Sequence, residues 1–167
     1  LPNVPFYGGI GYDYTNNVLW VGQNIGNVAG YCKVDPSSKS ILDQNVLPLG
    51  IGQSVNCMFF DVNHSKMLIG TNAIISATAS ANALDRIYAY RDMSTLIVCI
   101  GSDGVFGWAG TSNGAVYLFN PNNVVLRTSL TVRYPKAFGY DPTNGVMWLA
   151  AVDYIDQAQT ILGNVIY

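Results

Sequence analysis

The sequence predicts an all-β domain built from a repeated strand–turn–strand unit. Its 167 residues include ten acidic side chains, and every one is Asp because the chain contains no Glu. Helix surfaces usually draw on Glu, Lys, Gln, Arg and Ala, whereas Asp, Asn and Gly favour turns and Val, Ile, Tyr and Thr favour strands. This chain is rich in the second set, and a short motif that recurs along it points to the same class.

The recurring motif consists of an aromatic residue, an Asp, four turn residues and an apolar run. It is found at residues 11–22, 59–70 and 139–150. The Asp carboxylate can accept hydrogen bonds from backbone N–H groups of the turn, and Asn or Gly late in the turn tolerates a positive φ. Strands are therefore expected on both sides of each turn, and each copy is expected to be an antiparallel hairpin.

The spacing of the motif predicts about four units in a single domain, residues 1–167. Asp61 follows Asp13 by 48 residues, and Asp141 follows Asp61 by 80, which is two units of 40. A four-stranded propeller blade takes about 40–50 residues, so the length suits a small β-propeller of about four blades. A β-sandwich with repeated Asp-turn hairpins is the alternative.

Each unit is expected to contribute three or four strands. The first unit places them near 9–13, 18–22, 28–34 and 40–47, and the second near 55–60, 66–71, 86–90 and 95–100. The third unit, near 105–110, 115–119 and 123–132, and the fourth, near 137–140, 145–152 and 160–167, are each one strand short.

The turn sequences resemble those of a known repeat family. The run Tyr-Asp-Pro-Thr-Asn-Gly-Val-Met-Trp at residues 140–148 and the run Val-Asp-Pro-Ser-Ser-Lys at residues 34–39 are similar to the blades of NHL- and YVTN-type β-propellers. The resemblance covers most of the chain and implies a propeller, although that family usually has six or seven blades. The shorter length leaves open a four-bladed ring, an incomplete ring completed by a partner, or a sandwich with similar turns.

Charge is scarce, and this excludes some classes of partner. The net charge is −2 and only 11% of residues are charged. Nucleic-acid binding requires a positive surface, and no basic run exists, so it is not expected. The uncharged stretch at residues 69–84 contains too many Thr, Ser and Asn side chains for a membrane span.

The residues that carry catalysis are sparse. His64 is the only histidine and lies in a turn, no Gly-x-Ser-x-Gly motif exists, and no Gly-rich loop precedes a helix. No catalytic residue, metal site or cofactor is therefore expected, and the chain is interpreted as a non-enzyme. Cys32, Cys57 and Cys99 form no C-x-x-C pair and are expected to be buried thiols, with a Cys32–Cys57 disulfide as an open alternative.

The loops between the second and third strands of the units are expected to line one face, where propellers of the resembled kind bind ligands. Polar side chains in or near these loops are the candidate binding residues for a glycan, with calcium as an alternative because its ligands are oxygen atoms. They are Asn24, Asn27, Asn72, Asp85, Asn113, Asp153, Tyr154 and Asp156.

Two apolar segments are candidates for assembly. Residues 74–84, with Ile74 and Ile75, read as an uncharged insertion that is either packed on the body or covered by a partner. Residues 1–6, with Leu1, Pro2, Val4 and Phe6, read as an edge strand expected to pair with residues 160–167 of the same or another chain.

The sequence favours a non-enzymatic structural protein of an extracellular or virion surface, which self-associates and could polymerise by strand exchange. Low charge, an abundance of Asn and Tyr, and a chain that starts at Leu1 rather than Met fit a secreted or surface location. Asn63 heads an Asn-His-Ser glycosylation sequon on a turn. A glycan- or ligand-binding propeller module is the alternative, and a propeller lyase or hydrolase is the third reading.

Overall fold

The chain folds into four small antiparallel β-sheets that follow one another along the sequence. The computed structural model describes residues 6–25, 27–51, 53–79, 87–90, 95–152 and 159–165. Three sheets have four strands each and the last has three. No helix occurs in these ranges, and so none there is long and apolar enough to cross a membrane. The predicted all-β class is confirmed.

Each sheet is a meander in which consecutive strands pair. The first contains β1 (Phe6–Asp13), β2 (Val18–Ile25), β3 (Val28–Val34) and β4 (Ile41–Ile51). The second contains β5 (Cys57–Asp61), β6 (Lys66–Gly70), β7 (Ile74–Thr78) and β8 (Ile87–Tyr90). The third contains β9 (Ile97–Ser102), β10 (Gly107–Thr111), β11 (Ala115–Phe119) and β12 (Leu126–Thr131). The fourth contains β13 (Pro135–Asp141), β14 (Val146–Val152) and β15 (Gln159–Val165).

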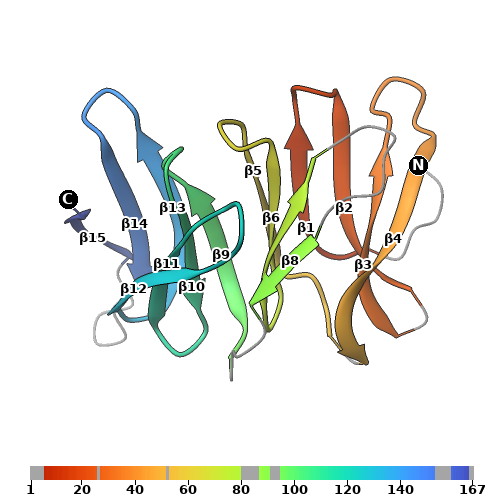
Figure 1. Cartoon of the computed structure of the whole chain (residues 1–167). Coiled ribbons are helices and arrows are strands. Elements are labelled where there is room, and N and C mark those ends of the chain that lie inside the picture. Colours follow the sequence, from red (N-terminus) through yellow and green to blue (C-terminus); the bar gives the residue numbers. More distant parts are fainter. Residues whose placement is uncertain are drawn as a thin grey trace.

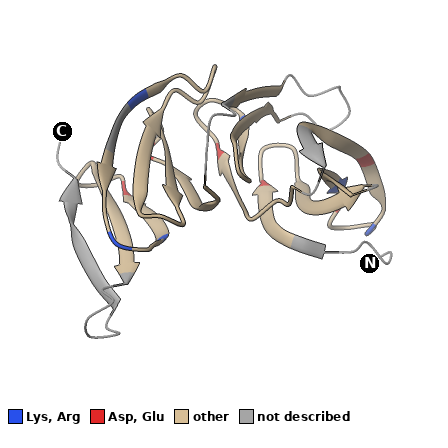
Figure 2. Ribbon diagram, turned by 90° about the horizontal axis from the view of Figure 1, so that it is seen from below, with Lys and Arg blue, Asp and Glu red and all other residues tan. Residues whose placement is uncertain are grey.

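The sheets stand side by side as the blades of a β-propeller (Figure 1). β1 packs beside β5, β5 beside β9 and β9 beside β13, so these four are the innermost strands. The first blade and the last lie at opposite ends of the row, and the view from below shows the few charged residues scattered over it (Figure 2). The prediction of a small propeller of four blades is confirmed, and the described blades form an open arc.

The blade boundaries differ from the prediction in the middle of the chain. The segment near 95–100, expected as the last strand of the second unit, belongs to β9, the first strand of the third blade. Its place in the second blade is taken by β8, because Ile74–Thr78 forms a strand, β7, instead of an insertion. Most of β7 is buried on both faces, so it lacks the alternation of apolar and polar residues by which a strand is recognised. The third blade is complete, and the fourth has three described strands.

Two of the candidate assembly residues lie in the interior. Ile74 is fully buried in the core between the second and third blades, and Ile75 is fully buried between the first and second. This part of the apolar segment is therefore packed against the body, and a partner has no access to either side chain.

The N-terminal candidate strand begins the first blade. Phe6, expected beside residues 160–167, instead pairs with Gln23 of β2. The segment it was expected to join contains β15, which pairs with β14 at the other end of the arc. Leu1, Pro2 and Val4 lie outside the described residues.

An Asp at the end of each innermost strand shapes the first turn of every blade. Asp13 and Asp141 each accept hydrogen bonds from backbone N–H groups two and three residues later, at 2.9–3.3 Å. Asp61 accepts one from the N–H three residues later, at 3.2 Å. Asp103 is the fourth member, with bonds of 2.8 and 2.6 Å. The predicted role of the Asp turn is confirmed, and it extends to the turn at Asp103, which lies outside the three copies of the motif.

Apolar side chains fill the space between neighbouring blades and form three cores. In β6, Met67 and Ile69 belong to the core shared with the first blade, whereas Leu68 belongs to the core shared with the third. This division follows from strand geometry, because successive side chains point to opposite faces of a sheet. Each internal blade is thus apolar on both faces and covered on both.

The three cysteines are free thiols. Cys32 and Cys99 are buried and Cys57 is partly exposed, and the Cys32–Cys57 disulfide that the sequence left open does not form. Burial raises the pKa of all three thiols, that of Cys99 to about 12. The thiolate, which is the reactive form, is therefore rare at neutral pH.

We expect replacement of Asp61 by Ala to lower the free energy of unfolding by about 2 kcal/mol, because a buried acceptor of backbone and side-chain donors is lost. Urea denaturation measures the change. Asp35→Ala is the matched control, since its carboxylate caps an exposed turn and its loss should shift the midpoint less. Equal midpoints for the two variants would contradict a structural role for the buried Asp turn.

We also expect the folded protein to resist alkylation by iodoacetamide at pH 8, because burial holds the pKa of each thiol above that pH. In urea, mass spectrometry should find all three cysteines modified. Rapid labelling of Cys32 or Cys99 under native conditions would show that these residues are not packed as described.

Candidate functional site

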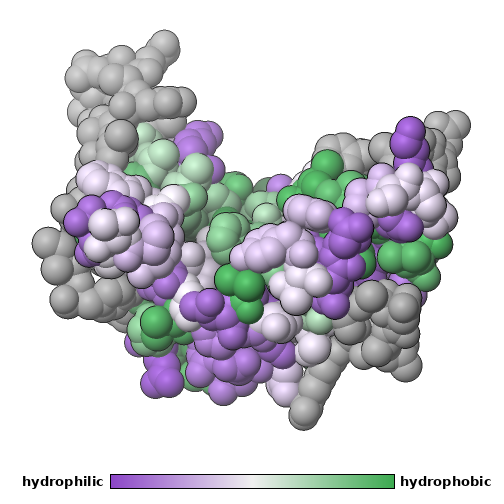
Figure 3. Space-filling view, turned by 90° about the horizontal axis from the view of Figure 1, so that it is seen from above, coloured by the Kyte–Doolittle hydropathy of each residue, from purple (hydrophilic) through white to green (hydrophobic). Residues whose placement is uncertain are grey.

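A pocket of about 690 Å³ lies on the concave side of the arc. Its lining comes from β1, β5, β13 and the turns that follow them, together with the turn after β9, so all four blades contribute. The space-filling view from above shows the molecule hollowed on this side, with hydrophobic atoms around the hollow (Figure 3). The pocket therefore exists only when the four blades are assembled.

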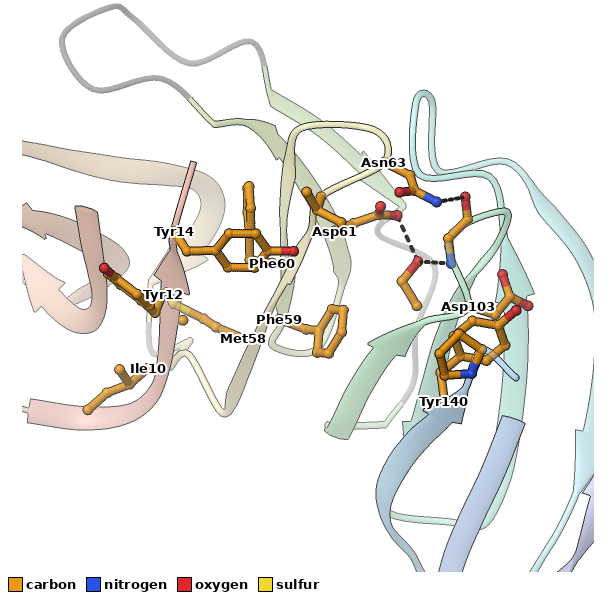
Figure 4. A pocket seen from close by; sticks show the side chains of 15 residues that line it. Ile10, Tyr12, Tyr14, Met58, Phe59, Phe60, Asp61, Asn63, Asp103 and Tyr140 are labelled. Atoms are coloured by element: carbon orange, nitrogen blue, oxygen red, sulfur yellow. Dashed lines mark hydrogen bonds between the residues drawn. The ribbon is translucent and has the colours of Figure 1, made fainter. Parts of the chain in front are cut away.

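Aromatic side chains form one part of the pocket wall. Tyr12, Tyr14, Phe59 and Tyr140 are each between 36% and 56% exposed. The ring of Tyr14 packs edge-to-face on Phe60, with 5.2 Å between centroids (Figure 4). Large exposed aromatic groups of this kind are common where a protein binds a partner or a sugar.

A hydrogen-bonded polar group forms another part of the wall (Figure 4). Asp61 Oδ2 lies 2.9 Å from His64 Nδ1 and accepts a hydrogen bond of 2.8 Å from the hydroxyl of Ser102. The same hydroxyl accepts the backbone N–H of Gly104 at 3.0 Å. Because Asp61 is in the second blade and Ser102 in the third, this group ties two blades together.

The polar group differs from a catalytic triad in its connections. In a triad the Ser hydroxyl donates to the His ring, which is held by the carboxylate. Here Ser102 and His64 both contact the same oxygen of Asp61, so no chain from nucleophile to base is formed. The nearby carboxylate of Asp103 is also engaged, by two backbone N–H groups and by Nε1 of Trp108 at 2.9 Å.

No group of three or more His, Cys or Asp side chains in the described part of the chain is arranged to hold a metal ion. The two pocket carboxylates are committed to turns and to contacts between blades. The chemistry on offer in the pocket is therefore contact with exposed aromatic rings and hydrogen bonding at its polar edge.

The candidate binding residues lie elsewhere. Asn24, Asn27, Asn72 and Asn113 lie in or beside the turns between the second and third strands, as predicted, but none of them lines the pocket. The pocket is formed instead at the ends where the first strand of each blade turns into the second. The other candidates, Asp85, Asp153, Tyr154 and Asp156, lie outside the described residues.

The sequon asparagine lies at the rim of the pocket. Asn63 is exposed, and its Nδ2 donates a hydrogen bond of 3.1 Å to the carbonyl oxygen of Gly104. Gly104 has a φ of +85°, and a Cβ there would approach Nδ2 of Asn63 to 2.3 Å. This close contact helps to join the turns of the second and third blades.

A second exposed feature lies at the end of the arc. Trp20, Trp108 and Trp148 hold the same place in their blades, because each is paired with a Gly of the innermost strand. Trp20 and Trp108 are 0% and 1% exposed, as expected for a core between blades, whereas Trp148 is 41% exposed. Its neighbours Met147 and Leu149 pack on the third blade, so Trp148 is on the opposite, outward face.

The sequence contained a signal for the pocket. Tyr12 and Tyr140 immediately precede the motif Asp in their blades, and Phe60 holds that place in the second blade. The resemblance to NHL- and YVTN-type propellers instead predicts a binding face at the turns between the second and third strands. The aromatic–Asp repeat itself marks the end at which the pocket is formed.

Comparison with solved structures agrees with this geometry. The β-propeller domain of Cps50 (Swd1) from Myceliophteria thermophila has a TM-score of 0.68 at 13% identity, covering 87% of this chain and 50% of that one. RRP9 WD40 repeats have a TM-score of 0.68 at 12% identity, covering 92% and 49%. The computationally designed Ika4 protein has a TM-score of 0.63 at 10% identity, covering 96% and 93%.

These likenesses show the propeller fold. The chain spans about half the length of the two natural propeller chains that it matches. No protein-family model and no curated protein matches the sequence.

Proposed function

We propose that this chain is a non-enzymatic structural protein that works by self-association. The observation that carries the proposal is the exposure of Trp148. The residues at the same repeat position in the other three blades are each buried against the following blade. They are Trp20, Leu68 and Trp108. A Trp left open in this way is typical of a surface that another polypeptide covers, since aromatic residues dominate the energetics of protein interfaces.

The absence of an enzymatic role is part of the proposal. It is supported by the pocket carboxylates, which accept hydrogen bonds from turns and neighbouring blades instead of facing a substrate. His64 is the single histidine of the chain and is already bonded to Asp61. An acid–base reaction would have to break this arrangement, which links the second and third blades.

The proposed location is an extracellular or virion surface. Low charge, together with a surface kept polar by Asn, Ser and Thr, supports it. The exposed sequon at Asn63 is compatible with it. Exchange of the N-terminal segment with Leu1, Pro2 and Val4 between chains stays a separate prediction, because these residues lie outside the described ranges.

A second candidate function is glycan or ligand binding in the concave pocket. The partly exposed rings of Tyr12, Tyr14 and Tyr140 favour it, because tyrosine presents an apolar face and a polar tip to a sugar ring. Asn63, at the rim, adds an amide group.

The proposed function is tested by the mass of the purified chain in solution. We expect analytical ultracentrifugation at micromolar concentration to find species heavier than the 18.0 kDa of one chain, because the outward face of Trp148 is then covered. Electron microscopy of the same sample shows the form of the assembly. A single species of one chain at every concentration would refute self-association.

The second candidate is tested by calorimetric titration with a panel of neutral oligosaccharides. Binding should be weakened at least about tenfold by Tyr14→Ala or Tyr140→Ala, since stacking on an aromatic ring is lost. Tyr134→Ala is the matched control, because Tyr134 is exposed to a similar extent outside the pocket. Absence of binding across the panel would remove this candidate.

A further inference from the structure

Every contact between neighbouring blades uses the same two faces. We call the face that packs on the following blade the leading face, and the face that packs on the preceding blade the trailing face. Trp108 is on the leading face of the third blade, and it meets Phe138 on the trailing face of the fourth with 6.2 Å between ring centroids. Trp20 is on the leading face of the first blade, and Met67 and Ile69 are on the trailing face of the second.

No described residue covers the leading face of the fourth blade. Besides Trp148, it contains Gly139, which is paired with Trp148 across the two strands. A Cβ added at the equivalent Gly101 would lie 2.9 Å from Cβ of Phe138 in the next blade, whereas one added at Gly139 has no atom within 4 Å. At Gly101 this space is filled by Phe138, a side chain from the first strand of the following blade. At Gly139 no described residue fills the same space.

Within the described ranges, the trailing face of the first blade lacks a covering blade as well. Ile10 is 53% exposed, whereas its equivalent Ile100 is 7% exposed against the second blade. Leu19 and Val21 are partly exposed, although their equivalents Met67 and Ile69 are fully buried. The described part of the arc thus ends in one free leading face and one free trailing face, and the residues named on both are apolar.

We propose that a second copy of this chain covers both faces, so that two copies close into one ring of eight blades. This inference rests on the proposed self-association and specifies it. Trp148 of each copy packs on Leu19 and Val21 of the other, and the space at Gly139 takes Ile10 of the other. In this fold a leading face packs on a trailing face, and each copy of the chain has one free face of each kind. A second copy is therefore complementary to both.

The curvature of the arc indicates closure at two copies. The chain covers 50% and 49% of the two natural propeller chains described above, each with a TM-score of 0.68, so its blades take up about half of a ring. A two-fold rotation then places each leading face on a trailing face and leaves no free end. The named residues on the two faces are uncharged, so the contact removes no charge from water.

Light scattering coupled to gel filtration measures the predicted state. We expect about 36 kDa, twice the 18.0 kDa of one chain, without growth at higher concentration. Trp148→Lys and Ile10→Asp should each weaken the dimer at least about 30-fold, since each places a charge in an apolar contact. Val125→Lys and Val105→Asp are the matched controls at other exposed positions and should leave the mass unchanged.

Mixing the two variants tests the head-to-tail geometry. A mixed dimer has one contact between two unchanged faces, and its other contact pairs Lys with Asp, so we expect a 1:1 mixture to recover the mass of two chains. Oxidation of a double variant, Gly139→Cys with Ile10→Cys, should link two chains into one closed species, because the two positions meet only between copies. Circular dichroism of each variant, compared with the unchanged chain, confirms that the blades are folded.

The outcomes separate this inference from the proposed function. A mass of two chains that is lost in both variants and recovered on mixing supports the ring. Open polymers, or a dimer that neither variant weakens, overturn the ring but leave self-association in place. A monomer at all concentrations overturns both.

Discussion

The structure depends on the need to cover both apolar faces of every blade. Side chains alternate along a strand, so a sheet of four strands has two faces, and here both are apolar. Neither face can be left in water at low cost, because burying apolar surface is the main favourable term in folding. A blade such as β5–β8 is stable between two neighbours, with Leu68 facing one and Met67 the other. The row of blades follows from this requirement. At each end of the described row, one apolar face has no neighbouring blade.

The polar groups of the chain serve the same arrangement. The Asp at the end of each innermost strand accepts hydrogen bonds from backbone N–H groups of the turn. Without it, these groups would need water as their partner. Asp61 does more than this, because it also accepts the hydroxyl of Ser102 from the next blade. A chain with so few charges therefore places one of them, nearly fully buried, at a junction between blades. The same junction forms the polar wall of the concave pocket.

The pocket and the end faces are consequences of one geometry. Tyr12 and Tyr140, on the innermost strands of the first and last blades, both line the pocket and are partly exposed. In a ring of two copies the two pockets would face each other across a common axis. Self-association and ligand binding would then be linked, since a group bound near the axis would contact both chains.

The sequence by itself determined the class, the repeat and the number of blades, because these depend on local chemistry. The Asp turn needs only the residues next to it, and Asp13 and Asp141 behave as their motif predicts. The recognition of Ile74–Thr78 as a strand required the tertiary structure, since a strand buried on both faces carries no alternation. Only the tertiary structure showed that Trp20 is buried and Trp148 is exposed. They hold the same position in the same motif, but one is covered by a following blade and the other is exposed, because burial depends on a neighbour that the local sequence does not encode.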